Sequence, residues 1–284
     1  MREKPQRSVS SGQSRPRNRQ YLPLDRRMIL YRLVIELVGR GLSYRRVQTA
    51  IFYHERLWLS KGTISEWVRG IHRPSGRINS FRPGPCPELA YVMGVVLSDG
   101  NLNIHGYNAE ILLSVTDYDY AEEFSRCLAK ILSRRKPYKV RRSEKRNRWI
   151  VQGSSVLLYQ FLNRPWQRLK SFLEHCEDCT AAFLRAFYDG EGCISQGSLV
   201  ISNTDKELLN YVRDLLRTLK IETGEPYVAT EAGTILKDPR TGKIYKRRHD
   251  CYNLVIRMKS RAQFASHVGF SIQRKQRLLR TATS

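Results

Sequence analysis

The chain has 284 residues, of which 41% are hydrophobic, so it is long enough for one large domain or two moderate ones. Its 50 lysines and arginines outweigh 26 acids, and a net charge of +24 points to a polyanionic partner, most simply nucleic acid. No apolar run approaches the roughly 18 residues of a membrane span, and no secretory signal follows the basic start, so we expect a cytoplasmic, nucleoid-associated protein without membrane contact.

The N-terminal region is predicted to contain a tail and a small helical domain. Residues 1–20 hold six basic residues with several Ser, Gln and Pro, which predicts a disordered basic tail or a phosphate-contacting arm. Residues 21–72 contain three helical stretches, the second capped by Ser43 and the third capped by Thr63. This pattern predicts a helix-turn-helix domain.

The third helix of this domain is predicted to enter a major groove of DNA. Ile64 and Trp67 would anchor it in the core, and its outer face would carry Lys61, Thr63, Ser65, Glu66 and Arg69. The stretch 52–59 makes a longer connection than the usual tight turn. A small helical packing module is therefore the alternative.

After a Pro- and Gly-rich linker at residues 73–87, two stretches, 94–100 and 186–192, share one pattern. Each is a short apolar run that ends in an acid and a glycine, with small residues four positions apart. On a helix this spacing puts both small residues on one face, where another helix can approach closely. We therefore predict that the two helices pack together through Gly94, Ser98, Ala186 and Gly190.

Packing of the two helices would bring Asp99 and Glu191 side by side. Two adjacent carboxylates are unfavourable unless a divalent cation binds between them, which makes the pair a candidate metal site. The alternative is a pair of ordinary helix-end acids, but an acid is electrostatically unfavourable at a helix C-terminus.

The order of expected helices and strands repeats after each motif, and Thr116-Asp117 recurs as Thr204-Asp205. The economical interpretation is an α+β fold with two αββαββα copies, residues 88–178 and 179–284, related by a pseudo-twofold axis. Such a chain would be a monomer with internal symmetry.

Each copy has a strongly basic strand region at the same place. Because the positive charge recurs at the same place in both copies, we favour contacts with DNA phosphates. The alternatives are a merely solvated face and the basic surface of a thermophilic or ribosome-associated protein. The predicted contacts are Lys139, Arg141, Arg142, Lys145, Arg146 and Arg148 in the first copy, and Lys243, Lys246, Arg247 and Arg248 in the second.

Six cysteines are scattered except for the Cys176-x-x-Cys179 pair. No second ligand pair at related spacing accompanies it, so free structural thiols are expected, with a metal site or a redox pair as alternatives.

With these motifs in place, residues 88–276 resemble the LAGLIDADG homing endonucleases in their single-chain, two-motif form. The resemblance rests on the paired motifs, on Leu89-Ala90-Tyr91 and Phe183-Leu184-Arg185 before them, and on Val268-Gly269-Phe270 and Arg274-Lys275-Gln276 near the end. The stretch Gly62-Thr63-Ile64-Ser65-Glu66-Trp67 is similar to helix-turn-helix domains fused to some archaeal members.

The resemblance implies Mg²⁺-dependent hydrolysis of double-stranded DNA, with Asp99 and Glu191 as catalytic metal ligands. Asp189 falls at the earlier acidic position, where the first copy has Leu97, so it is not expected to be a symmetric ligand. The resemblance also implies a charge-stabilising group at the end of a final strand, for which Arg257, Lys259 and Gln152 are candidates. The alternative function is a non-cleaving nucleic-acid-binding protein of the same fold, such as an intron RNA maturase or a transcription regulator.

Overall fold

The computed structural model describes residues 22, 24–71, 74, 81–105, 108–195, 198–238 and 241–283. The chain divides into two compact units, Met1–Arg77 and Ile78–Ser284. The basic tail expected at residues 1–20 lies outside the described residues, as does much of the linker. Among the described helices, none combines the length and apolarity needed to cross a membrane.

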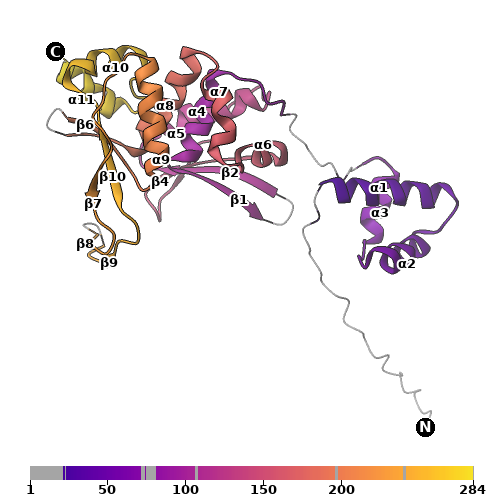
Figure 1. Cartoon of the computed structure of the whole chain (residues 1–284). Coiled ribbons are helices and arrows are strands. Elements are labelled where there is room, and N and C mark those ends of the chain that lie inside the picture. Colours follow the sequence, from indigo (N-terminus) through magenta and orange to yellow (C-terminus); the bar gives the residue numbers. More distant parts are fainter. Residues whose placement is uncertain are drawn as a thin grey trace, which may run out of the picture. The chain divides into compact units, whose positions relative to one another are not determined.

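The first unit consists of α1 (Leu24–Gly39), α2 (Tyr44–Glu55) and α3 (Lys61–Val68) (Figure 1). Its small core contains the buried side chains of α3 that were predicted as anchors, Ile64 and Trp67. The predicted cap of α3 was wrong by three residues, because Ser60 rather than Thr63 is the N-cap. Ser60 Oγ accepts a hydrogen bond from the backbone N–H of Thr63 at 3.0 Å, which satisfies one free donor of the first turn.

The connection between α2 and α3 is shorter than the sequence suggested. Helix α2 continues to Glu55, and Arg56 ends it in the left-handed conformation, so only residues 56–60 join the two helices. Gln48 secures this connection, because its side-chain Nε2 donates to the Leu59 carbonyl at 2.7 Å.

The second unit runs through the same order of elements twice, as predicted. The first copy contains α4 (Pro87–Leu97), β1 (Gly100–His105), β2 (Asn108–Val115), α5 (Tyr118–Ile131), β3 (Arg141–Ser143), β4 (Arg148–Ser154) and α6 (Val156–Leu162). A 3₁₀ turn, η1 (Trp166–Leu169), and α7 (Lys170–Leu173) lead to the second copy. That copy contains α8 (Glu177–Glu191), β5 (Gly192–Ser195), β6 (Ser198–Asn203), α9 (Lys206–Thr218), β7 (Tyr227–Thr230), β10 (Cys251–Val255), η2 (Met258–Ser260) and α10 (Arg261–His267).

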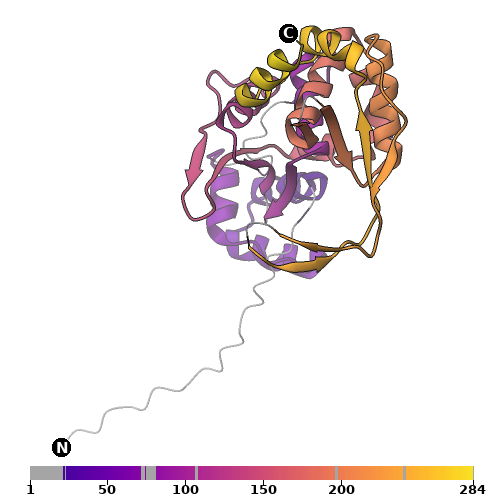
Figure 2. The same cartoon turned by 90° about the vertical axis from the view of Figure 1, so that its left-hand side faces the viewer.

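Two additions break the symmetry of the copies. A hairpin of β8 (Ile235–Lys237) and β9 (Ile244–Lys246) is inserted between β7 and β10, and α11 (Gln273–Thr283) follows α10. Figure 2 shows the β8–β9 hairpin at the far end of the long arm that β7 and β10 form.

The two antiparallel sheets have the strand orders β1-β2-β4-β3 and β5-β6-β10-β7, which confirms the α+β class. Figure 1 shows the helices on one side of both sheets, so the other face of each sheet is left without a helical cover. Helices α4 and α8 lie at the centre of one continuous apolar core. Most side chains of both helices are buried, because each packs against the other and against its own sheet.

Candidate active site

Helices α4 and α8 meet through the four small residues of the two motifs. A Cβ added at Gly94 would lie 2.6 Å from the Phe183 carbonyl oxygen and 2.8 Å from Ala186 Cβ. A Cβ added at Gly190 would lie 2.5 Å from Ser98 Oγ. No side chain fits in these gaps, so the two helix backbones approach each other closely along the whole contact.

This contact brings Asp99 and Glu191, here called the carboxylate pair, to adjoining helix ends. The Asp99 carboxylate lies directly against α8, since a Cβ on Gly190 would be 3.3 Å from Asp99 Oδ2. Glu191 is the last residue of α8, and Asn203 Nδ2 on β6 donates to its Oε1 at 3.3 Å. The two carboxyl groups therefore share one corner of the second unit.

The electrostatics of the carboxylate pair reflect this crowding. Burial raises the pKa of Glu191 to about 7, and the negative charge of Asp99 adds to the increase. Although Asp99 is open to solvent, partial burial of its carboxyl raises its pKa too, and the charges of Lys275 and Arg148 oppose the rise. A bound divalent cation would offset the repulsion between the two carboxylates and so favour the ionised form of both.

The third motif acid, Asp189, points away from this pair into the protein. It is 2% exposed and accepts hydrogen bonds from the backbone N–H groups of Ser271 and Ile272 at 3.1 and 3.2 Å. Tyr91, on α4, donates its hydroxyl proton to Asp189 Oδ2 at 3.3 Å. Asp189 thus satisfies the free N–H groups just before α11, as a capping carboxylate does, and burial raises its pKa to about 6.

Helix α11 is also attached to the first copy. Gln273 N–H donates to Asp119 Oδ2 at 3.0 Å, and the Arg274 guanidinium binds Asp117 with two bonds of 2.6 and 2.9 Å. Asp117 and Asp205 occupy equivalent N-cap positions of α5 and α9, but only Asp205 caps its own helix. In the first copy that carboxylate binds α11 instead.

Lys275, which sequence reasoning did not single out, lies beside the carboxylate pair. It is only 6% exposed, and its Nζ donates to the carbonyls of Asp189 and Tyr188 at 2.6 and 3.3 Å. Its charge acts on both Asp99 and Glu191. Lys275 is part of the Arg274-Lys275-Gln276 stretch that carries the family resemblance, but that resemblance assigned it no role. No local pattern predicts that a C-terminal helix folds back to this corner.

Two of the three residues expected to stabilise charge, Arg257 and Lys259, lie away from the carboxylate pair. Lys259 Nζ pairs with Glu222 Oε2 at 2.8 Å, and Arg257 lies beyond the end of β10. The backbone N–H of Ile256, the residue before Arg257, donates to the Leu199 carbonyl near the start of β6. Glu191 instead contacts Asn203 at the other end of β6. The register thus does not bring Arg257 and Lys259 to the carboxylate pair. Gln152, in contrast, lies opposite Leu112 of β2, which pairs with Asn101 of β1, so the register places it two strands from the residues that follow Asp99. Its Oε1 accepts from Arg141 at 2.8 Å.

The basic residues predicted to contact DNA lie in and around β3 and β4 in the first copy, and in and next to the β8–β9 hairpin in the second. All those of the first copy are exposed, and in the second copy only Arg247 is half-buried. Arg142 stacks over Trp149, 4.9 Å from its ring centroid, and Arg148 donates to the Ser114 carbonyl at 2.9 Å. These contacts hold part of the positive charge on fixed strands.

The β8–β9 hairpin adds a surface without a counterpart at the equivalent place in the first copy, where the four described residues 144–147 join β3 to β4. Its register pairs Ile235 with Lys246 and Lys237 with Ile244, so apolar and basic side chains alternate on one face. Ile235 and Ile244 are 72% and 67% exposed, and Tyr245 on the other face is 50% exposed. Apolar side chains of this kind can contact thymine methyl groups while lysines contact phosphates.

In the first unit, the expected contact residues of α3 are partly accessible. Lys61 and Arg69 are exposed, whereas Thr63 and Ser65 are half-buried and Thr63 Oγ1 is hydrogen-bonded to Ser60 Oγ at 2.9 Å.

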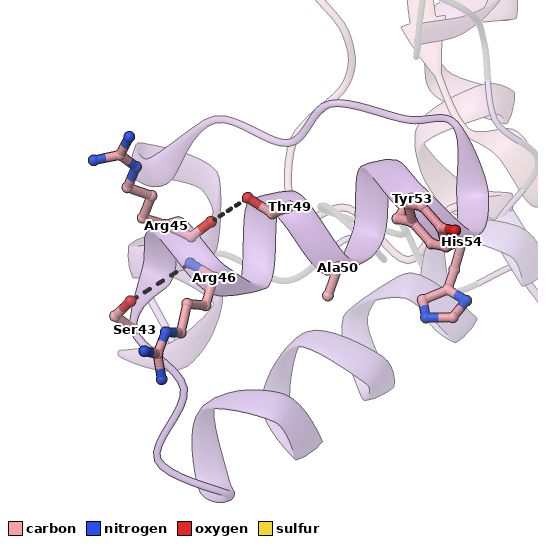
Figure 3. A pocket seen from close by; sticks show the side chains of 7 residues that line it. All are labelled: Ser43, Arg45, Arg46, Thr49, Ala50, Tyr53 and His54. Atoms are coloured by element: carbon pink, nitrogen blue, oxygen red, sulfur yellow. Dashed lines mark hydrogen bonds between the residues drawn. The ribbon is translucent and has the colours of Figure 1, made fainter.

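A second basic face of this unit lies on α2. An open depression of about 580 Å³ is lined by Ser43, Arg45, Arg46, Thr49, Ala50, Tyr53 and His54 (Figure 3). Ser43 Oγ caps the start of this helix by accepting from Arg46 N–H at 3.5 Å. The face carries two guanidinium groups and three hydroxyls, which are groups that contact phosphates.

The six cysteines are free thiols, and those of Cys176 and Cys179 lie 3.3 Å apart at the start of α8. Within the part of the chain that the structure describes, no cluster of three or more His, Cys, Asp or Glu side chains could hold a metal ion. The carboxylate pair therefore supplies two protein ligands to any metal bound there.

Comparisons with known proteins agree with this architecture. Residues 178–269 match the model of the LAGLIDADG-like domain. The uncharacterized protein MJ0398 of Methanocaldococcus jannaschii is 31% identical over 254 residues, which cover 88% of this chain and 91% of that protein. Among solved structures, I-DmoI in complex with DNA and Ca matches 64% of this chain and 88% of its own, with 19% identity and a TM-score of 0.48. Full-length DUF199/WhiA from Thermatoga maritima matches 71% of this chain and 61% of its own, with 17% identity and a TM-score of 0.43.

Proposed function

Because the chain belongs to the LAGLIDADG family, we propose that it is a sequence-specific endonuclease that hydrolyses both strands of duplex DNA with the help of Mg²⁺. The observation that carries this proposal is the carboxylate pair, which the close contact of α4 and α8 holds at one corner. The homing endonuclease I-DmoI has been crystallised with DNA and divalent metals.

The ligands offered by the carboxylate pair fit Mg²⁺. This ion prefers oxygen ligands and is commonly held by one or two carboxylates together with substrate phosphates and water. Burial is the main cause of the raised pKa of Glu191, and the added effect of the Asp99 charge is consistent with two acids close enough to share a cation. Asp99 and Glu191 would hold the metal, which when bound stabilises the attacking and leaving oxygens of the phosphodiester.

The remaining parts of the chain would bind and orient the DNA. Exposed lysines and arginines of the two basic strand regions would neutralise phosphates, and side chains on the open sheet faces would read base edges in two half-sites. Arg148 connects the DNA-binding surface with the carboxylate pair. It is the first residue of β4 in the basic strand region, and its positive charge opposes the rise in the pKa of Asp99. It is placed to hold the phosphate next to the site of cleavage.

Cleavage can be tested without knowing the target. The protein is incubated with Mg²⁺ and a library of duplexes of random sequence, and the DNA ends it produces are sequenced. Recurrent staggered double-strand ends at one sequence are the expected result. Asp99→Asn and Glu191→Gln should each lower the cleavage rate at least about 100-fold, the order expected when a transition-state contact is lost.

Asp178→Asn is the matched control for these variants. Asp178 is an exposed acid of the same helix α8 but lies in its first turn, at the end away from Glu191. The Asp178→Asn variant should cleave DNA as fast as the wild type. If Asp99→Asn and Glu191→Gln cut as fast as Asp178→Asn, the site assignment is wrong.

A second candidate function is a binder of nucleic acid that does not cleave, whether a transcription regulator or an intron RNA maturase. The observation in its favour is the first unit, which carries the basic face of α2 and is separate from the carboxylate pair. Filter binding of duplex DNA and of structured RNA separates the candidates. Tight RNA binding together with no cleavage of any duplex would favour the maturase.

A further inference from the structure

Lys275 is a buried lysine, which is unusual because burying an ammonium group costs free energy unless the group is well paired. Lys275 meets this cost through two backbone carbonyls of α8 and the ring of Phe270, whose centroid is 5.6 Å from Nζ. None of these partners is a carboxylate. The ammonium group is thus held by the end of a helix, next to two acids that it does not bind directly.

The carbonyls that Lys275 contacts belong to the last turn of α8, the turn that ends in Glu191. The last carbonyls of a helix lack intrahelical partners, and a cation there also offsets the helix dipole. The Gly192 N–H bonds the same Tyr188 carbonyl, so Lys275 and Gly192 together close this turn. Fraying of the turn would move the Glu191 carboxylate.

The position of Lys275 is itself fixed from both copies. Asp189 binds the backbone just before α11, and Asp117 and Asp119 of the first copy bind Arg274 and Gln273. Gly269 enters this segment with φ +60°, and Gln276 Oε1 accepts from the Phe270 N–H at 2.7 Å. The side chain of Lys275 therefore has little freedom to leave the end of α8.

We propose that Lys275 is a positioning residue of the active site: it closes the last turn of α8 and thereby holds Glu191 in place to share a metal ion with Asp99. The inference rests on the proposed metal-dependent function. In the competing role for the same charge, the ammonium group occupies the place of the cation. The two roles have opposite consequences for metal binding.

Direct measurement of metal binding separates them. Mn²⁺ is titrated into the DNA-free protein and the free ion is followed by electron paramagnetic resonance. In Lys275→Met the Kd for Mn²⁺ should rise about tenfold, Lys275→Arg should restore it to within about twofold, and Arg277→Met should leave it unchanged, as expected of a residue that orients a metal ligand. Arg277 is the matched control, an exposed cation of the same helix.

Lys275→Gln, which keeps a neutral donor, replaces Lys275→Met if the latter fails to fold, as judged by circular dichroism. A Kd that stays the same or falls in the Lys275 variant overturns the inference. Failure of the proposed function is seen separately. In that case the wild type binds no more Mn²⁺ than the double variant Asp99→Asn/Glu191→Gln, whatever Lys275 does.

Discussion

At the scale of single residues, the three motif acids have different environments that their local sequence does not reveal. Asp99 and Glu191 face each other at the helix ends, whereas Asp189, only two positions from Glu191, is buried against the segment before α11. Substituting Asp189 would leave two N–H groups without their acceptor, so it would destabilise the fold rather than report on chemistry.

The raised pKa of Glu191 predicts a pH dependence of stability in the metal-free protein. The folded-state pKa of about 7 lies above the ordinary value of 4.5, so the folded protein binds this proton more tightly than the unfolded chain. The extra stability of the folded state from this proton is fully present below pH 4.5, the ordinary pKa, and is lost as the pH rises through about 7. Raising the pH from about 6 to about 8 should therefore lower Tm.

Thermal melts with EDTA test this prediction, and Glu191→Gln is the decisive variant. It cannot ionise, so its Tm should change less over this pH range, and Mg²⁺ should reduce the change in the wild type. Asp189, whose pKa is about 6, also titrates in the lower part of this range, but it does so in both proteins, so the difference between their slopes reports on Glu191. An unchanged slope in Glu191→Gln would refute the assignment of the titration to this residue.

At the scale of elements, the contact of α4 and α8 determines whether the carboxylate pair forms. Gly94 lies against the backbone of α8 and against Ala186 Cβ, and neither can move far in a packed core. We expect Gly94→Ala to lower the free energy of unfolding by about 1–3 kcal/mol, the cost typical of overpacking. Chemical denaturation of the full chain measures this loss.

Gly224→Ala provides the control for the Gly94 variant. Gly224 lies in the same unit, and a Cβ there would meet nothing within 4 Å. Its stability should equal that of the wild type or slightly exceed it, because alanine restricts the unfolded chain. Equal stability of Gly94→Ala and Gly224→Ala would show that the two helices are not in close contact.

At the scale of the whole molecule, the net charge of +24 predicts steep salt dependence of DNA binding. Each phosphate neutralised releases counterions, so the logarithm of the binding constant should fall linearly with the logarithm of salt concentration. The β8–β9 hairpin should contribute to this slope on one half-site only, since the first copy has no equivalent. Lys243→Gln/Lys246→Gln should reduce the slope by about one unit per lost phosphate contact.

The salt titration needs a control with the same change of charge. Arg217→Gln/Arg277→Gln removes two exposed cations that lie on helices α9 and α11 rather than on a strand or hairpin. Its slope should match that of the wild type. Equal slopes for the two double variants would mean that the hairpin does not contact phosphates.

The sequence by itself determined the repeated order of elements, the α+β class and the pairing of the two motif helices. These follow from local signals, because helical spacing, strand-forming runs and small residues four apart act within a few turns of chain. It also located Ile64 and Trp67 in the core of the first unit, although it misplaced the cap of α3 by three residues.

The surroundings of the carboxylate pair depended on the tertiary structure alone. Lys275 reaches the last turn of α8, which ends in Glu191, only because α11 folds back onto it. Likewise, Asp117 binds Arg274 across 157 residues of chain. The family resemblance led us to expect the basic group at the strand ends, at Arg257 and Lys259, but the pairing of β10 with β6 places these residues away from the carboxylate pair. Burial, pairing register and long-range hydrogen bonds arise only when distant segments pack, so no local pattern could assign these partners.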